Sequence, residues 1–449
     1  MTAVLKEGYW RALTTLRDLR TRQWPAWRRY RRILAEVNRD GGARVPRPCA
    51  RRLLLLTWEF PPSVTGGVYR PASFLQFARA HGWEASAIVA RGPAQPTSAG
   101  EYLWRKLPPE LGITRVEPAP SAALHWLPRI DGGMLNAMNV YTSARAQWMP
   151  GPRGVILTSG PPFHSFLAAR WLSAVTGWKL VLDYRDEWTE APFTFVDKAA
   201  ENRAFEDECL RHADRVIFTT ESQRTHALSC FPSLRQEATA VVYNGWDPED
   251  FVTAEGSIRS AAGPLRLAYL GNLGAMASPA SFLETLASVL ARDPALRAVL
   301  RVQFIGTRRP DALEHLRAFP YPEVIELVDP VPKADACRIM QEVDGLLLLN
   351  PSELTRYIQG KFYEYMAAGT RILVYGAGGE MGGIVDRLSA GDTVPEGNVE
   401  ALAAVLRGLR VPLAGDAAAR RAWLASRERG PLAAHLYAML DALIAEPPR

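Results

Sequence analysis

The sequence predicts two successive α/β domains, each built on a doubly wound parallel sheet, behind a basic helical extension. The 449 residues are more than one hydrophobic core usually holds, which favours two domains. Short runs rich in Val, Ile and Leu alternate with helical patterns, and this alternation stops near residues 250–263 and then restarts. We expect an extension and linker over residues 1–49, domains over 50–255 and 256–415, and a helical segment over 416–449.

Six apolar runs predict the strands of the first sheet. They are Arg52–Thr57, Ala85–Ala90, Gly154–Ser159, Lys179–Asp183, Arg215–Thr219 and Thr239–Tyr243. Five further runs predict the second sheet, namely Leu265–Leu270, Val302–Ile305, Val324–Leu327, Gly345–Leu349 and Arg371–Tyr375. Because the runs lack polar alternation, we expect strands buried on both faces, as in parallel sheets. Ligands bind such sheets beyond the carboxyl ends of the strands.

Composition excludes several classes of protein. Apolar residues make up 48% and charged residues 22%, which is ordinary for a soluble folded chain. The longest aliphatic runs, Leu53–Leu56 and Leu346–Leu349, are far below the ~20 residues that span a bilayer. Glu7 and several arginines interrupt the first residues, so no signal peptide is expected. We therefore expect a cytoplasmic protein.

The cysteines and glycines exclude further classes of site. Cys49, Cys209, Cys230 and Cys337 are scattered, without a CxxC pair or a Cys/His cluster, so neither a zinc site nor a disulfide framework is predicted. The glycines after the strand at 371–375 lack GxGxxG spacing because position 381 is Met381, which argues against a nicotinamide or flavin site. No cofactor and no metal are expected.

The extension carries most of the positive charge. Residues 1–52 hold 14 Lys/Arg and 4 Asp/Glu, a net +10, while the whole chain carries +6. Helical spacing over residues 3–40 predicts two helices, the second opened by Pro25. Trp24 and other aromatic residues lie among the arginines, which suits the surface of an anionic membrane through residues 1–45. Equally, the helices could pack on the first domain with the arginines merely solvating them. No nucleic-acid motif accompanies the arm.

Polar and glycine residues follow three predicted strands of the first domain. Gly66 and Gly67 precede a helix, an arrangement that lets backbone N–H groups approach a phosphate, although an ordinary strand–helix turn would look the same. His164 follows the strand at 154–159, and Arg185 and Asp186 follow the strand at 179–183. Side chains at these strand ends are candidates to meet a substrate, while a structural role for His164 stays open.

The second domain offers a turn and a helix. Gly271-Asn272 closes its first strand. Lys361 and Glu364 are three residues apart, so they share a helix face near its first turn. A carboxylate can accept ribose hydroxyls and a lysine can bind pyrophosphate. An exposed Lys–Glu pair worth only ~0.3–0.5 kcal/mol is the alternative.

Together these segments resemble glycosyltransferase family 4, over about residues 52–410. The strongest likeness is Gly360-Lys361-Phe-Tyr-Glu364-Tyr-Met-Ala-Ala-Gly369, which is similar to the donor helix of that family. The resemblance implies a GT-B fold, with an acceptor domain and a nucleotide-sugar-binding domain facing a cleft. It implies metal-independent, retaining transfer from a nucleotide diphosphate sugar to a hydroxyl of a carbohydrate or lipid-linked acceptor, in cell-envelope polysaccharide or glycolipid synthesis. Catalytic roles then fall to His164, Asp186 and Arg185, and donor contacts to Gly66, Gly67, Gly271, Asn272, Lys361 and Glu364.

Two positions depart from the family pattern. Arg356 occupies the place of the first glutamate of the Glu-x7-Glu signature, and Asn272 stands where many members carry arginine. Two other interpretations therefore stay open. One is a sugar-nucleotide epimerase, and the other is a non-catalytic partner subunit with the same fold.

Overall fold

The computed structural model divides into two compact units. It describes residues 17–40, 49–93, 97–120, 125–147, 152–193, 196–251, 263–274 and 276–446. Unit 1 comprises the described residues of Met1–Phe218, Arg224–Val241 and Ala434–Arg449, and unit 2 those of Thr219–Gln223 and Val242–Ala433. The first predicted helix and most of both linkers lie outside the described residues.

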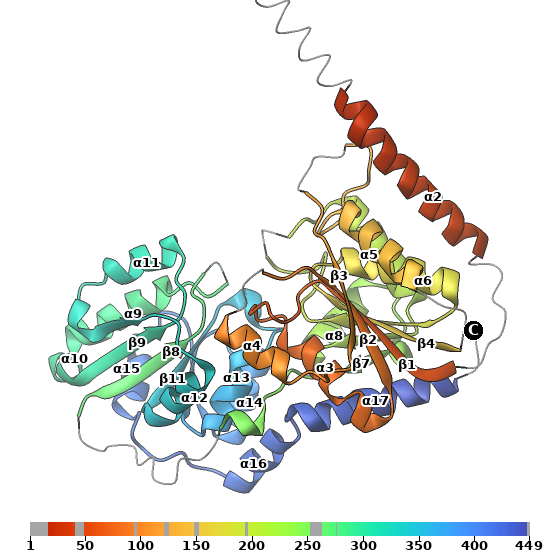
Figure 1. The fold of residues 1–449 in the computed structure, drawn as a ribbon. Coiled ribbons are helices and arrows are strands. Elements are labelled where there is room, and N and C mark those ends of the chain that lie inside the picture. The colour runs from red at the N-terminus through yellow and green to blue at the C-terminus, as the bar shows by residue number, and fades with distance from the viewer. Residues whose placement is uncertain are drawn as a thin grey trace, which may run out of the picture. The chain divides into compact units, whose positions relative to one another are not determined.

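Unit 1 is built on a seven-stranded parallel sheet in the order β3-β2-β1-β4-β5-β6-β7 (Figure 1). Its strands are β1 (Cys49–Thr57), β2 (Glu84–Ala90), β3 (Gly112–Val116), β4 (Arg153–Gly160), β5 (Lys179–Tyr184), β6 (Arg215–Phe218) and β7 (Thr239–Val241). Its helices are α3 (Tyr69–Phe77), α4 (Ser98–Arg105), α5 (Met134–Gln147), α6 (His164–Thr176), α7 (Ala200–His212) and α8 (Glu221–Cys230). Every residue of β4 and β5 is buried, as expected for central strands covered on both faces.

Unit 2 is built on a six-stranded parallel sheet in the order β10-β9-β8-β11-β12-β13. Its strands are β8 (Leu265–Leu270), β9 (Leu300–Ile305), β10 (Ile325–Val328), β11 (Gly345–Asn350), β12 (Arg371–Gly376) and β13 (Gly391–Val394). Its helices are α9 (Ala280–Arg292), α10 (Pro294–Val299), α11 (Pro310–Arg317), α12 (Lys333–Glu342), α13 (Gly360–Ala368), α14 (Gly379–Leu388), α15 (Val399–Arg407) and α16 (Ala417–Ala425). The α/β class with two doubly wound parallel sheets is confirmed.

Two of the four edge strands, β3 and β13, were not predicted. Most of their residues are only half-buried, and each strand carries charged or polar side chains. An edge strand pairs on one side only and needs no continuous apolar run, so the pattern that marks central strands is absent.

The final helix, α17 (Arg429–Ala445), begins in unit 2 and ends in unit 1. In unit 1, the Tyr437 hydroxyl donates to the Phe74 carbonyl at 2.6 Å, and Arg51 forms an ion pair with Asp441 at 2.8 Å. The end of the expected segment 416–449 therefore packs on the first sheet's unit. No helix in the described part of the chain is long and apolar enough to cross a bilayer.

The described part of the extension is one continuous helix that packs on unit 1. A π-helical turn over Leu19–Gln23 runs directly into α2 (Trp24–Asp40), so the break expected at Pro25 is absent. Proline inside a helix lacks the N–H for one i→i−4 hydrogen bond, and the π-helical turn directly before Pro25 marks this change in the hydrogen-bond ladder. Ile33 and Val37 are buried in the hydrophobic core of unit 1, and α2 lies along α5 and α6 (Figure 1). This favours the docked arrangement for residues 17–40.

Candidate functional site

In each unit, the predicted site residues follow the carboxyl ends of neighbouring central strands. In unit 1 these strands are β1, β4 and β5, and in unit 2 they are β8 and β11. Parallel strands bring the following loops to one edge of the sheet, which is where ligands bind in such folds. We describe the two sites separately.

Arg185 fastens three loops of unit 1 together. Its guanidinium donates to the Glu59 carboxylate at 3.0 Å and to the backbone carbonyls of Gly67 and Pro161. The Arg185 side chain is 7% exposed, so these bonds are shielded from water. With its donors committed to protein acceptors, Arg185 holds the loops after β1 and β4 in place.

Gly67 is required by this arrangement, whereas Gly66 is not. A Cβ at Gly67 would lie 1.8 Å from Arg185 Nη1 and 2.0 Å from Glu59 Oε2. A Cβ at Gly66 would meet no atom within 4 Å. Gly67 therefore allows the close approach of the Arg185–Glu59 pair to the backbone, while Gly66 lies in open space.

Asp183 and Asp186 have different surroundings. Asp183 is fully buried, where it pairs with Arg70 at 2.6 Å and accepts a bond from Ser159 at 2.8 Å. Asp186 is half-buried and makes no hydrogen bond or ion pair within the described residues. Burial raises the pKa of Asp186, although the neighbouring Arg185 partly offsets this. Asp183 therefore fixes β5 to α3, whereas the Asp186 carboxylate takes no part in this network.

His164 lies beneath the surface at the start of α6. Its side chain is 0% exposed, and neither ring nitrogen has a hydrogen-bond partner in the described part of the chain. The Trp58 ring contacts it edge-on with centroids 4.5 Å apart, and a Cβ at Gly132 would lie 2.0 Å from Nδ1. Burial lowers the pKa of His164 to about 3, so the ring is neutral near pH 7.

In unit 2, Lys361 lies against an aromatic ring at the start of α13. Its Nζ is 3.7 Å from the centroid of the Tyr269 ring at the end of β8, and a Cβ at Gly271 would lie 3.0 Å from Nζ. Burial lowers the pKa of Lys361 to about 7, although Glu364 acts in the opposite direction. Lys361 and Gly271 were predicted as site residues but Tyr269 was not, because it lies in a mostly apolar strand and looks like a core residue.

Glu364 is held by a lysine that the motif analysis missed. Lys333, the first residue of α12, donates to the Glu364 carboxylate and lies 3.8 Å from Asp250. Burial by itself lowers the pKa of Lys333, but the Glu364 and Asp250 carboxylates raise it above its ordinary value. Glu364 is thus kept in place by a charged partner on a neighbouring helix.

The turn after β8 is braced by the residues after β9. The Asn272 side-chain oxygen accepts from Thr307, and the backbone N–H of Arg309 donates to the Leu273 carbonyl at 3.0 Å. A Cβ at Gly274 would lie 2.9 Å from Arg309 Cδ, so the Arg309 side chain runs beside this turn. Arg309 is a cation close to the position where the family pattern carries arginine and this chain has Asn272.

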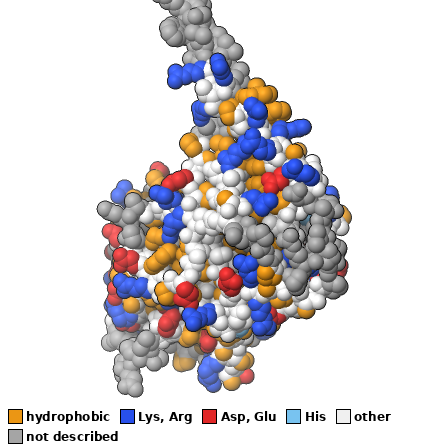
Figure 2. All heavy atoms as spheres, turned by 45° about the vertical axis from the view of Figure 1, so that its right-hand side comes forward, with side chains coloured by type: hydrophobic (Ala, Val, Ile, Leu, Met, Phe, Trp, Pro, Cys, Tyr) orange, Lys and Arg blue, Asp and Glu red, His pale blue; other side chains and the backbone are white. Residues whose placement is uncertain are grey.

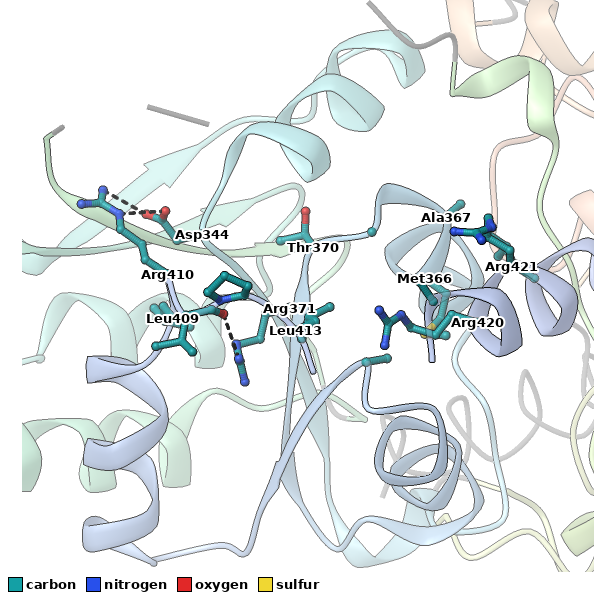
Figure 3. A pocket seen from close by; sticks show the side chains of 16 residues that line it. Asp344, Met366, Ala367, Thr370, Arg371, Leu409, Arg410, Leu413, Arg420 and Arg421 are labelled. Carbon is teal, nitrogen blue, oxygen red and sulfur yellow. Dashed lines mark hydrogen bonds and ion pairs between the residues drawn. The ribbon is translucent and has the colours of Figure 1, made fainter. Parts of the chain in front are cut away.

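A pocket within unit 2 is a separate feature. It measures about 630 Å³ and lies near the amino ends of β11 and β12, where Asp344 and Arg371 line it (Figure 3). Arg410 donates to Asp344 at 3.0 Å, and Arg371 donates to the Val411 carbonyl at 3.0 Å. These cations are committed to protein acceptors at the edge of the sheet opposite Lys361, so the pocket is not the candidate donor site.

One group of possible metal ligands was not predicted. The sequence shows no Cys/His cluster, yet the structure brings Glu190, His226 and Cys230 together in unit 1, with one ligand atom from each within 4.8 Å of the others. His226 and Cys230 are four residues apart, a spacing that places both on one helix face. The third side chain comes from a distant segment, which is why motif spacing alone missed the group.

Comparisons with known proteins agree with this architecture. Residues 65–245 match the family model described as "Glycosyl transferase 4-like domain". HepE from Anabaena, solved in complex with UDP, is 14% identical with a TM-score of 0.62, over 87% of this chain and 100% of that one. A glycosyltransferase from Rickettsia africae is 13% identical with a TM-score of 0.62, over 88% of this chain and 99% of that one.

A lipopolysaccharide outer core galactosyltransferase, WaaB, is 11% identical with a TM-score of 0.58, over 87% of this chain and 99% of that one. At these identities the likeness establishes the fold, which is the GT-B fold of glycosyltransferases. The sequence matches none of the curated proteins with which it was compared.

Proposed function

We propose that this chain, whose first unit carries a glycosyl transferase 4-like domain, is a glycosyltransferase that moves a sugar from a nucleoside diphosphate sugar to an acceptor hydroxyl. The observation that supports this most is the partly desolvated Lys361 beside the Gly271 turn, with Glu364 on the same helix face. The first donor to test is UDP-glucose, because HepE was solved in complex with it. Transfer with retention, without a metal ion in the chemical step, is part of the proposal.

Negative charge develops on the departing diphosphate during such a transfer. A pre-placed cation in a partly dry site stabilises that charge more than water does. Lys361 supplies one cation, and Arg309 beside Gly274 supplies a second in place of the arginine missing at Asn272. The Gly66 turn offers room for a phosphate because an added Cβ there meets nothing within 4 Å, and Gly271 has a φ of +128°, a conformation that favours glycine, beside Lys361.

The residues of unit 1 have unequal roles in this proposal. Asp186 meets the reacting sugar or the acceptor hydroxyl, since it makes no hydrogen bond within the described residues. His164 supports the same region as a neutral ring under Trp58. Arg185 is a positioning residue, because Glu59 and backbone carbonyls already take its donors. The acceptor is a carbohydrate or lipid-linked hydroxyl in the synthesis of a cell-envelope polysaccharide or glycolipid.

Calorimetric titration with UDP, GDP and ADP, followed by liquid chromatography–mass spectrometry of the matching nucleotide sugars, tests the proposal. A transferase binds one nucleoside diphosphate and slowly releases free sugar from its nucleotide sugar. An isomeric nucleotide sugar would instead indicate an epimerase. If the protein binds a nucleotide but forms neither free sugar nor an isomeric nucleotide sugar, even with an envelope extract present, it is a non-catalytic partner subunit. Arg356 and Asn272, which depart from the family pattern, are the reason to test this alternative. A protein that binds none of the nucleotides would overturn the proposal.

A further inference from the structure

Three metal-ligating side chains meet in unit 1 outside the candidate donor site. Glu190 lies in the loop after β5, and His226 and Cys230 lie one turn apart on α8. A Glu190 carboxylate oxygen, a His226 ring nitrogen and Cys230 Sγ all lie within 4.8 Å of one another. All three side chains are half-buried, so they are reachable from solvent yet partly ordered by packing.

The distance between the two helix ligands already suits a tetrahedral metal ion. His226 Nε2 and Cys230 Sγ are 3.5 Å apart. A tetrahedral zinc ion with ordinary Zn–N and Zn–S bonds places its nitrogen and sulfur ligands about 3.6 Å apart. Because both side chains stand on one helix face, this spacing is set by the fold. A small movement of the Glu190 side chain would bring its carboxylate to the same ion as a third ligand.

Glu187 fixes the imidazole in the form that a metal needs. Its buried carboxylate lies 2.7 Å from His226 Nδ1. A carboxylate that accepts the Nδ1 proton leaves the lone pair on Nε2, which faces Cys230 Sγ. Metal-bound histidines usually have such a partner on the other ring nitrogen. The alternative is a simple His226–Glu187 ion pair, which would explain the contact at Nδ1. It would not explain why a thiol and a second carboxylate lie on the Nε2 side of the ring.

The surrounding charges balance when a divalent ion is present. Arg203 contacts the Glu190 carboxylate and donates to the Cys230 carbonyl at 2.7 Å. A dication with the Cys230 thiolate, the Glu187 and Glu190 carboxylates and the Arg203 guanidinium makes a neutral group.

We propose that Glu190, His226 and Cys230 bind one divalent transition-metal ion of the zinc class, with Glu187 as a positioning residue. Thiolate and imidazole ligands select zinc or cobalt over magnesium or calcium. Three protein ligands leave one coordination position for water or an added ligand. Since the loop after β5 also carries Asp186, the ion fastens α8 to the loop that holds a candidate substrate residue.

The test titrates Co²⁺ into the reduced, untagged, chelator-treated full-length protein while the visible and near-ultraviolet absorption is recorded. We expect a thiolate-to-cobalt charge-transfer band that saturates at one ion per chain and disappears on addition of Zn²⁺. Cys230→Ser and His226→Gln should each lose this band, and a normal circular dichroism spectrum would show that the variants fold. Cys49→Ser is the matched control, because Cys49 is also half-buried, and it should keep the band.

Glu187→Gln should keep the band but weaken Co²⁺ binding about 10–100-fold, as expected for a residue that orients a ligand. A merely structural Glu187 would change stability without changing metal affinity. The absence of a charge-transfer band in the wild-type protein would overturn the proposal. So would a band that survives in Cys230→Ser, because another thiol would then be the ligand. Both outcomes are independent of nucleotide binding.

Discussion

Lys361 Nζ lies 3.7 Å from the centroid of the Tyr269 ring, so the ammonium group of the donor helix faces an aromatic side chain of the first strand of unit 2. The ring partly replaces water around the cation, and Glu364 is the nearby carboxylate that favours its charged form. Burial nevertheless lowers the pKa of Lys361 to about 7. An anionic ligand at the Gly271 turn would complete the surroundings of a cation that the protein alone stabilises incompletely.

The first prediction is a pH dependence of donor binding. Without ligand, Lys361 loses its proton as the pH rises through about 7, whereas a bound diphosphate raises its pKa. Affinity for the nucleoside diphosphate should therefore weaken as the pH rises from about 7 to about 9, by up to tenfold per unit. Calorimetry in buffers of different ionisation enthalpy should also show proton uptake on binding at the alkaline end.

Two variants check that Lys361 is the group responsible. Lys361→Arg stays charged throughout this range, so its affinity should not change with pH. Lys361→Met should bind weakly and with the same flat profile. A wild-type affinity that is constant over the range would contradict the assignment of a low pKa to a donor-binding lysine.

The second prediction concerns Glu364. Replacement by Ala removes charge-assisted hydrogen bonds to the ribose, which should cost ~1.5–3 kcal/mol and weaken donor binding at least tenfold. It also removes the ion pair between Lys333 and Glu364, so the melting temperature should be measured in parallel. Glu353→Ala is the matched control, because Glu353 is an exposed glutamate of the same region and should bind donor normally. If Glu364→Ala binds every accepted nucleotide with unchanged affinity, Glu364 does not bind the ribose.

Motif reasoning predicted the residues that local sequence places together, and it missed those that the fold brings in. Lys361 and Glu364 are three apart on one helix, so their shared face could be read from the sequence. Lys333 comes from another helix and Tyr269 from another strand. Neither belongs to a local pattern, since a lysine that opens a helix and a tyrosine in an apolar strand both look structural.

The same limit applies to the roles of charged residues. Asp183, Arg185 and Asp186 stand almost side by side in the sequence, and spacing alone does not distinguish their roles. Their burial and their hydrogen-bond partners in the structure do distinguish them. Arg70 reaches Asp183 from α3, and Glu59 reaches Arg185 from the loop after β1, so we propose only Asp186 of the three as a residue that contacts a ligand.

The third prediction uses the neighbouring glycines as a matched pair. Gly67→Ala places a Cβ 1.8 Å from Arg185 Nη1, so Arg185 must move away from Glu59. Overpacking of this kind should cost about 1–3 kcal/mol of unfolding free energy and should lower transfer activity. Gly66→Ala meets no atom within 4 Å and should leave stability nearly unchanged. Chemical denaturation of both variants measures the difference. Equal losses of unfolding free energy in the two variants would contradict the role of Arg185 in holding these loops together.

The fourth prediction separates the stability and activity roles of His164. The folded pKa of about 3 lies below the ordinary value of 6.5, so the unfolded chain binds more protons between these limits. Stability from this group is therefore full above about pH 6.5 and is lost as the pH falls. His164→Leu, close in volume, removes two nitrogens without partners and should change stability by less than about 1.5 kcal/mol at pH 7.

Denaturant unfolding at about pH 7 and about pH 5 measures the expected difference. The wild-type protein should lose about 2 kcal/mol more than His164→Leu over this interval. If the variant also turns over more slowly with unchanged donor affinity, His164 serves the reaction as well as the fold. Equal pH dependence in both proteins would mean that His164 is not buried as a neutral ring in solution.

The last prediction concerns membrane binding by the extension. Ile33 and Val37 dock α2 on unit 1, while Arg20, Arg28 and Arg32 are exposed. Figure 2 shows Lys and Arg side chains gathered along the described helix of the extension, below its grey segment. Deletion of residues 1–45 should abolish binding to anionic vesicles and preserve donor binding, but it also uncovers the apolar surface beneath α2. A variant that changes charge alone therefore gives the clearer test.

Replacing Arg20, Arg28 and Arg32 by Gln removes three exposed charges and leaves the docked face intact. At about 1 kcal/mol for each basic residue near an anionic surface, vesicle binding should weaken by roughly 100-fold. Sedimentation with anionic phospholipid vesicles at low salt measures this, and high salt should weaken wild-type binding because mobile ions screen surface charges. The control replaces Arg317, Arg387 and Arg421, three exposed arginines of unit 2, and should bind like the wild type. If the full-length protein does not bind such vesicles at low salt, the membrane proposal is wrong and α2 is only a helix docked on unit 1. Its exposed arginines would then face water and bind no membrane.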